Sequence, residues 1–125
     1  MLGLHHLAIV VSDLTVAERF YAGVLGLPVV ERWNDDSGVP RSVWLGLEGR
    51  AFLAIERASA SSPKRTDGAP GLHCVAFRIA HSERERHRAT LEKAGFPVER
   101  ESPYTLYVRD PDGNLVALSH HPDPA

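Results

Sequence analysis

Two matching stretches of the sequence decide its fold. Residues 4–11 read Leu-His-His-Leu-Ala-Ile-Val-Val, and residues 72–79 read Leu-His-Cys-Val-Ala-Phe-Arg-Ile. Both are apolar and rich in β-branched residues, as strands are, and a polar start and a helical pattern follow each of them. Self-similarity of this kind is the signature of an internal repeat. The chain is therefore predicted to hold two copies of one structural unit.

The two predicted helices end at the same kind of signal. Helices are expected over residues 17–25 and 84–93, and they stop at Leu25-Gly26-Leu27-Pro28 and Ala94-Gly95-Phe96-Pro97. Glycine suits the left-handed position after a helix, and the proline forbids its continuation. Extended segments are predicted at 28–33, 41–47, 51–57, 97–101, 104–109 and 114–119, with a turn at Asp110-Pro111-Asp112-Gly113. Each unit therefore reads βαβββ.

Length and composition narrow the function. A chain of 125 residues is predicted to form one domain, with units at about 3–57 and 72–121, a linker at 58–71 and a possible lid at 34–40. With a net charge of -2 the chain is not expected to have the basic surface that binds nucleic acid. No apolar run is long enough to span a membrane. Glutamates interleave the arginines of residues 83–88, which predicts a solvated helix face. The lone Cys74 is consistent with a cytoplasmic protein.

The opening and closing motifs resemble those of a known superfamily. His6-Leu-Ala-Ile-Val-Val-Ser-Asp13-Leu14, then Phe20-Tyr21 and Leu25-Gly26-Leu27, is similar to the opening signature of the vicinal oxygen chelate superfamily of glyoxalases, bleomycin resistance proteins and extradiol dioxygenases. Residues 107–118 resemble its closing signature. The resemblance implies an α+β fold in which two tandem βαβββ units form an open, cup-shaped mixed sheet. It also implies a homodimer and, in many members, a divalent metal in the cup.

The resemblance also places the metal ligands of the superfamily on this sequence. They fall on His6 and Cys74 in the first strands of the units, and on Ala54 and Ala117 in the last strands. Alanine has no lone pair, and one imidazole and one thiol are fewer than the three protein ligands that a catalytic zinc normally keeps. We therefore expect no metal or other cofactor. A surviving divalent metal would be held by His6, Cys74 and Glu56.

Strand alternation predicts the side chains that line the cup. A mostly apolar wall with a few polar groups is typical of a small-molecule pocket. Trp33, Trp44, Tyr104 and Tyr107 could stack on a planar ligand or pack in the core. The predicted lining is His6, Ala8, Val10, Phe52, Ala54, Glu56, Cys74, Ala76, Arg78, Leu115, Ala117 and Ser119. The predicted ligand-binding set is His6, Trp44, Phe52, Ala54, Glu56, Cys74, Arg78, Tyr107 and Ala117.

The histidines have different predicted roles. His6 is the candidate catalytic residue, as a general base or a hydrogen-bond anchor in the cavity. By alternation His5 and His73 should point away from the cup and pack under the helices, and His120 and His121 are expected in a frayed tail. Cys74 is expected to be an inert, small apolar side chain, because a reactive thiolate needs a positive neighbour.

Three functions are compatible with this sequence. The first is a metal-independent protein that binds a small organic ligand in the cup, similar to the bleomycin-resistance branch. The second is a metal-dependent lyase, isomerase or dioxygenase with a rebuilt metal site, so that enzymatic activity is undecided. The third is a partner or regulatory protein whose cup is vestigial.

Overall fold

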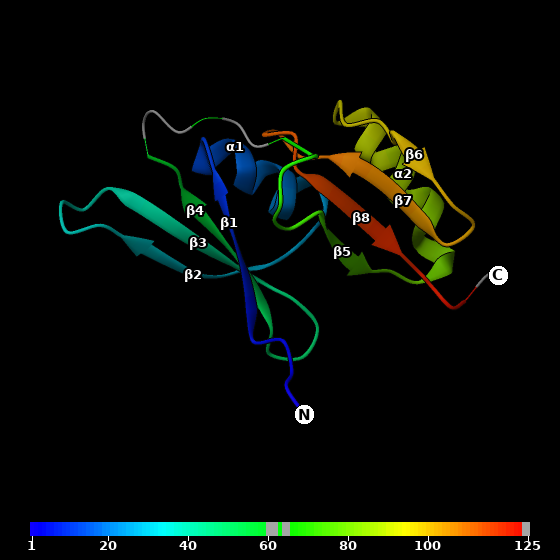
Figure 1. The fold of residues 1–125 in the computed structure, drawn as a ribbon, viewed down its shortest axis with the longest axis horizontal. Coiled ribbons are helices and arrows are strands. Elements are labelled where there is room, and N and C mark those ends of the chain that lie inside the picture. The colour runs from blue at the N-terminus through cyan, green and yellow to red at the C-terminus, as the bar shows by residue number, and fades with distance from the viewer. Residues whose placement is uncertain (60–62, 64–65, 124–125) are drawn as a thin grey trace. The chain divides into compact units, whose positions relative to one another are not determined.

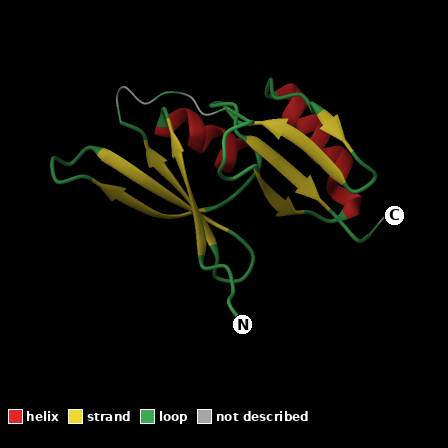
Figure 2. Ribbon diagram, in the orientation of Figure 1, coloured by secondary structure: helices red, strands yellow, loops and turns green. Residues whose placement is uncertain are grey.

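The chain folds into two compact units. The computed structural model describes residues 1–59, 63 and 66–123, and the chain divides into Met1–Pro63 and Lys64–Ala125. Each unit holds a four-stranded sheet and a helical segment (Figures 1 and 2). Most of the predicted linker at 58–71 is described, and its residues 60–62, 64 and 65 lie outside the described part.

The first unit has the predicted βαβββ order. Its sheet runs in the order β1-β4-β3-β2, with β1 parallel to β4 and the other pairs antiparallel (Figure 1). The helical segment follows β1 directly. The elements are β1 (His6–Val11), α1 (Leu14–Glu18), the π-helix η1 (Arg19–Val24), β2 (Val29–Asn34), β3 (Pro40–Gly46) and β4 (Phe52–Arg57).

The helix of the first unit begins at an N-cap and changes its winding halfway. The Asp13 carboxylate accepts a hydrogen bond from the Val16 N–H at 3.0 Å, which satisfies one free donor of the first turn. From Arg19 onward the helix is a π-helix, and the Leu25 N–H bonds to the Phe20 carbonyl at 3.0 Å. Phe20 and Tyr21 are fully buried, whereas Val24 and Leu25, predicted on the same face, are only partly buried.

An ion pair shows which face of the first sheet the helix covers. Arg32 of β2 donates two hydrogen bonds to Glu18 of α1, at 2.7 and 2.8 Å, so its side chain lies on the helix side. Arg32 is paired with Val43 of β3, and Val43 with Ile55 of β4. The core of the unit is therefore built on this side of the sheet. Val43, Leu45, Leu53 and Ile55 are 3% exposed or less.

The second unit repeats the topology with a shorter edge strand. Its sheet runs in the order β5-β8-β7-β6, and β5 is parallel to β8. The strand predicted at 97–101 shrinks to two residues, Arg100–Glu101. The elements are β5 (Cys74–Arg78), the 3₁₀ turn η2 (His81–Glu83), α2 (Arg84–Lys93), β6 (Arg100–Glu101), β7 (Thr105–Arg109) and β8 (Leu115–Ser119).

Helix α2 corrects the prediction of a solvated arginine face. Arg84 and His87 are only 8% and 9% exposed, so this part of the run faces the sheet. Arg84 donates to the Ser102 carbonyl at 2.8 Å and to the Glu101 carboxylate at 3.2 Å. The sequence did not reveal this because the partners of Arg84 lie on a distant strand and turn. Buried arginine is tolerated when its donors are satisfied in this way.

The end of the chain corrects a second prediction. His120 was expected in a frayed tail, but it is 4% exposed. Arg84 donates a hydrogen bond to its Nε2 at 2.9 Å, and its Nδ1 bonds to the Asp123 carbonyl. Since an arginine can only donate, His120 carries its proton on Nδ1. His121, by contrast, is exposed, as expected.

Two carboxylates hold the hairpin turns. Asp110 accepts hydrogen bonds from the N–H groups of Asp112 and Asn114, at 2.9 and 2.8 Å, so the predicted turn between β7 and β8 is confirmed. The loop at 34–40, predicted as a possible lid, is the turn between β2 and β3. Its Asp35 accepts from the Val39 N–H at 3.0 Å and from Arg57 at 2.9 Å.

Within the described residues, no helix is long and apolar enough to span a membrane.

Candidate functional site

The face of the first sheet that lies away from α1 carries the residues predicted to line a binding site. His6 is paired with Phe52, Ala8 with Ala54 and Val10 with Glu56 across β1 and β4, and Trp44 is paired with Ala54 from β3. Because side chains alternate along a strand, all of these side chains project opposite to the core residues Val43 and Ile55. The predicted lining of the first unit therefore shares one face.

Four rings form a continuous row across this face, which we call the ring row: His6, Phe52, Trp44 and Trp33. The His6 ring is stacked on Phe52 with centroids 4.7 Å apart and planes 4° apart. Trp44 is stacked on Phe52 at 4.3 Å and 20°, and Trp33 lies against Trp44 at 5.4 Å and 56°. Since β4 lies between β1 and β3, Phe52 is held between His6 and Trp44.

The ring row is buried at its centre and exposed to solvent at its two ends. Phe52 and Ala54 are buried, at 9% and 2% exposure. Trp33 on the outer strand is 43% exposed, and Val10 on the other outer strand is 62% exposed. His6 is exposed as well. The face thus combines a fixed aromatic floor with apolar surface in contact with water.

His5 does not lie where alternation predicted. It was expected under the helix, but its ring contacts two members of the ring row. It meets His6 edge-to-face at 5.1 Å and Phe52 at 5.6 Å, and the Nδ1 atoms of His5 and His6 are 2.8 Å apart. His5 precedes the first residue of β1, so strand alternation does not govern its direction. The adjacent His-His pair in the sequence was the only available signal.

The corresponding face of the second unit has a different chemistry. Glu101 of β6 bonds to Arg84 and Arg88 of α2, so Glu101 and its partner Leu106 face the helix. Tyr107 therefore lies on the other face, where it is paired with Ala117 of β8. The rest of the predicted lining of this unit shares that face by register. These residues are Cys74, Ala76 and Arg78 on β5 and Leu115, Ala117 and Ser119 on β8.

This second face carries polar and cationic groups. The Arg100 guanidinium lies over the Tyr107 ring, 4.3 Å from its centroid, and the Thr105 hydroxyl donates to the Ser119 hydroxyl at 2.9 Å. Arg78 is exposed and Cys74 is half-buried. A guanidinium over a ring face is a favourable cation–π contact. The first unit therefore offers rings, and the second offers charge and hydroxyl groups.

Arg109 is a third cation on this face, and sequence reasoning did not single it out. It binds Asp67 through two hydrogen bonds of 3.0 and 2.9 Å, and it donates to Glu99 at 2.8 Å. These bonds raise the pKa of Arg109 and lower the pKa of Glu99. Two carboxylates thus balance its charge, and Asp67 fastens the segment before β5 to the sheet.

The residues present do not fit the cation that the superfamily resemblance implies. Among the residues that the structure describes, no three His, Cys, Asp or Glu side chains are placed to hold a metal ion. Ala54 and Ala117, at the last-strand ligand positions, have no donor atom. Glu56, named as a replacement ligand, pairs with Val10, whereas His6 pairs with Phe52 at the other end of the strand. A cation normally needs three protein ligands in a catalytic site.

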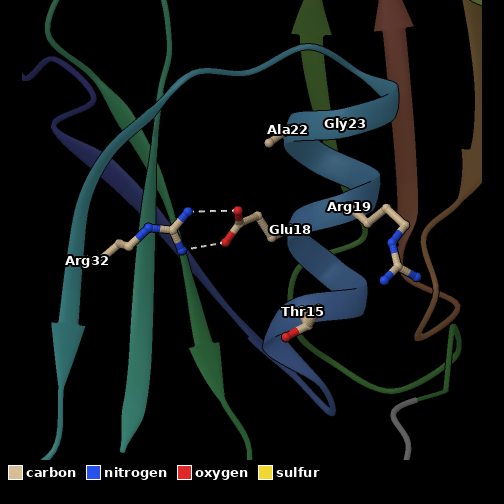
Figure 3. Close-up of a pocket in the computed structure, with 6 residues that line it drawn as sticks. All are labelled: Thr15, Glu18, Arg19, Ala22, Gly23 and Arg32. Carbon is tan, nitrogen blue, oxygen red and sulfur yellow. Dashed lines mark hydrogen bonds and ion pairs between the residues drawn. The ribbon is translucent and has the colours of Figure 1, made fainter. Parts of the chain in front are cut away.

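A separate groove lies on the helix side of the first unit. It measures about 560 Å³, and Thr15, Glu18, Arg19, Ala22, Gly23 and Arg32 line it. Figure 3 shows the Arg32 guanidinium and the Glu18 carboxylate meeting across it, while Arg19 points away from both. The hydrogen bonds from Arg32 lower the pKa of Glu18. Since these two charges satisfy each other, the groove offers little to a charged ligand.

Comparison with known proteins assigns the chain to a family. The family model of the glyoxalase/bleomycin resistance protein/dioxygenase superfamily matches residues 3–118. The virulence protein STM3117 of Salmonella typhimurium is 27% identical, over 93% of this chain and 82% of its own. The glutathione transferase FosA of Serratia marcescens is 28% identical, over 92% and 78%.

A solved structure agrees with this match. The glyoxalase family protein of Enterococcus faecalis superimposes with a TM-score of 0.74 at 28% identity, over 94% of this chain and 97% of that one. The two βαβββ units and the length of the family match point to the same conclusion. The chain belongs to the glyoxalase/bleomycin resistance protein/dioxygenase superfamily.

Proposed function

We propose that the protein binds a flat organic molecule against the ring row, without a metal ion. The observation that carries this proposal is the row of four rings on the open sheet face, with Trp33 and His6 exposed at its two ends. Aromatic pairs contribute about 0.5–1.5 kcal/mol beyond the burial of their area. Phe52, fixed between two neighbours, also loses little freedom when a ligand binds.

Calorimetric titration with naphthol, a flat aromatic probe, tests this proposal. We expect Trp33→Ala to weaken binding by about twofold to tenfold, because one ring contact is lost. The control is Val39→Ala, which trims another exposed apolar side chain in the turn outside the ring row. Equal affinity in the wild type and Trp33→Ala, or equal losses in both variants, would contradict the proposal.

We propose binding without a metal ion because the side chains at the ligand positions provide too few donor atoms. His6 and Cys74 provide one imidazole and one thiol, and Ala54 and Ala117 provide nothing. Metal analysis of protein purified without chelators is the direct test, and we expect less than one tightly held cation per chain. A full equivalent of bound cation would overturn the metal-independent binding mode and favour a metal-dependent enzyme.

An enzymatic function is the second candidate, and His6 is the observation that favours it. Its imidazole is exposed at one end of the ring row, where a general base could reach a bound molecule. The relative FosA is named a glutathione transferase. A lyase, isomerase or dioxygenase activity with added divalent metal should disappear in His6→Ala. Unchanged turnover in that variant would remove His6 from the mechanism.

We further propose a homodimer in the cytoplasm. Apolar side chains outside the ring row are exposed in the first unit, among them Leu4 at 68% and Val30 at 55%, and a partner chain could cover them. Sedimentation at micromolar concentration should give twice the chain mass, and a monomer mass would contradict the proposal.

A vestigial site with a purely regulatory role would give no thermal stabilisation with any ligand tested.

A further inference from the structure

His5 and His6 form a pair of imidazoles joined through their Nδ1 atoms. The Nδ1 atoms are 2.8 Å apart, which is a hydrogen-bond distance. The His6 ring is also fixed by parallel stacking on Phe52, with planes 4° apart. His5 in turn meets His6 and Phe52 edge-to-face. The His6 ring is therefore held from two directions, and its Nε2 is the nitrogen left for a ligand.

A hydrogen bond between two imidazole nitrogens needs one proton, so the pair has two possible arrangements. If His5 donates, His6 carries its own proton on Nε2 and offers a ligand a donor. If His6 donates, its Nε2 keeps a lone pair and offers a ligand an acceptor. A working histidine is commonly set in the second arrangement, by donating its Nδ1–H to a neighbour.

We propose that His5 is a positioning residue that accepts the Nδ1–H of His6 and keeps the Nε2 lone pair of His6 facing the ligand. The proposal rests on the proposed function and adds a ligand class to it. The preferred ligand is a flat aromatic molecule with a hydroxyl or N–H group at its edge, which packs against the ring row and donates a hydrogen bond to His6. In the second unit the equivalent residues are His73 and Cys74, so the imidazole pair is not repeated.

The free protein provides the first test. Long-range proton–nitrogen NMR correlations, recorded at about pH 8.5 where imidazoles are ordinarily neutral, show which ring nitrogen carries the proton. We expect His6 to be protonated on Nδ1 in the wild type. The His5→Asp variant, whose carboxylate can only accept, should keep this tautomer, and His5→Ala should lose it. His73→Ala is the matched control in the second unit and should leave the His6 signals unchanged.

The outcomes of this experiment decide the proposal without any ligand. His6 protonated on Nε2 in the wild type and on Nδ1 in His5→Asp would show the reverse arrangement and overturn it. The same His6 tautomer in the wild type and His5→Ala would show that His5 does not set it. Because His5 is exposed, its substitution should not unfold the chain.

A second measurement connects the pair to binding. We compare naphthol with methoxynaphthalene, which has the same rings and no donor. His5→Ala should weaken naphthol binding about threefold to tenfold, the scale of one hydrogen bond, and leave methoxynaphthalene within about twofold. Equal losses for both probes would contradict the ligand class. Failure of both probes to bind the wild type would count against the proposed function, and the NMR result would still decide the role of His5.

Discussion

At the scale of single residues, His120 shows how one side chain fixes the end of the chain. Its Nε2 accepts from Arg84 at 2.9 Å, and it is 4% exposed. His120→Ala leaves a buried guanidinium without this acceptor, so we expect a loss of about 1–3 kcal/mol in the free energy of unfolding, measured with urea. His121→Ala changes the exposed neighbour and should cost less than half as much. Equal losses at both positions would show that the Arg84 contact contributes nothing.

His87 gives the protein a pH-dependent stability. Burial lowers its pKa below the usual 6.5, and the charge of Arg86 adds to this effect. The unfolded chain therefore takes up a proton more readily than the folded one. The contribution of neutral His87 is complete above about pH 6.5 and is lost as the pH falls through the lowered folded-state pKa.

The lowered pKa of His87 predicts a difference in pH-dependent stability between the wild type and a variant without this imidazole. Between about pH 8 and 5, wild-type protein should lose more stability than His87→Gln, because the variant has no buried imidazole to protonate. Urea unfolding across this range provides the measurement. His73→Gln, which removes an exposed imidazole, should follow the wild-type curve. A His87→Gln curve parallel to the wild type would remove His87 as the source of the pH dependence.

The sequence predicted side-chain directions correctly at residues that lie within a strand. It assigned His6, Phe52, Ala54 and Glu56 to one face because alternation holds throughout β1 and β4. It was wrong for His5 and His120, which lie just outside strands. Their directions are set by contacts with Phe52 and Arg84 respectively, and no local pattern encodes such contacts. Whether the assigned face binds a ligand stays a prediction.

At the scale of elements, two glycines in the helical segments have opposite requirements. Gly95 ends α2 with a φ of +90°, and the Phe96 N–H bonds back to the Leu91 carbonyl at 2.8 Å. Gly23 lies inside η1, where an added Cβ would meet only the Arg19 side chain at 3.8 Å. One position therefore needs glycine and the other does not.

These requirements predict effects of opposite sign. Gly95→Ala should lower the free energy of unfolding by about 1–2 kcal/mol, because alanine is strained in the left-handed region. Gly23→Ala should raise it by about 0.5–1 kcal/mol, because it restricts the unfolded chain without a clash. Thermal unfolding of the two variants checks both. Destabilisation by Gly23→Ala would indicate that the π-turn needs the freedom of glycine.

Elements were predictable where local signals were strong. The bounds of α2 match the prediction over residues 84–93, because glycine and proline mark its end. The π-turn at Arg19–Val24 could not be read from the sequence, since the periodic apolar residues fit an ordinary helix equally well. The strand predicted at 97–101 was expected to be longer than β6 for a similar reason. A β-rich composition at 97–101 does not specify how many residues find a partner on β7.

At the scale of the whole molecule, the two units share a backbone plan and differ in the chemistry of their open faces. The pairing of Ala8 with Ala54 recurs as Ala76 with Ala117. The first unit nevertheless carries the stacked Trp44 and Phe52 on its open face, and the second carries Arg100 over Tyr107. Because equivalent apolar positions build the two cores, the repeat is recognisable in the sequence. The surface positions are free to diverge, because they contribute little to stability.

The size of the units suggests that they unfold together. A unit of about 60 residues buries too little surface to be more than marginally stable alone. Both tryptophans, Trp33 and Trp44, lie in the first unit, so their fluorescence follows that unit, while circular dichroism follows both. If the units unfold together, a substitution in the second core can be read out in the first.

Ile55→Ala and Leu118→Ala are matched substitutions for this purpose. Ile55 on β4 and Leu118 on β8 occupy equivalent positions in the repeat and are 0% and 2% exposed. Each should cost about 2–5 kcal/mol. If unfolding is cooperative, Leu118→Ala lowers the urea midpoint of tryptophan fluorescence as much as that of circular dichroism. A fluorescence midpoint that Leu118→Ala leaves at its wild-type value, while Ile55→Ala lowers it, would instead establish two independent folding units.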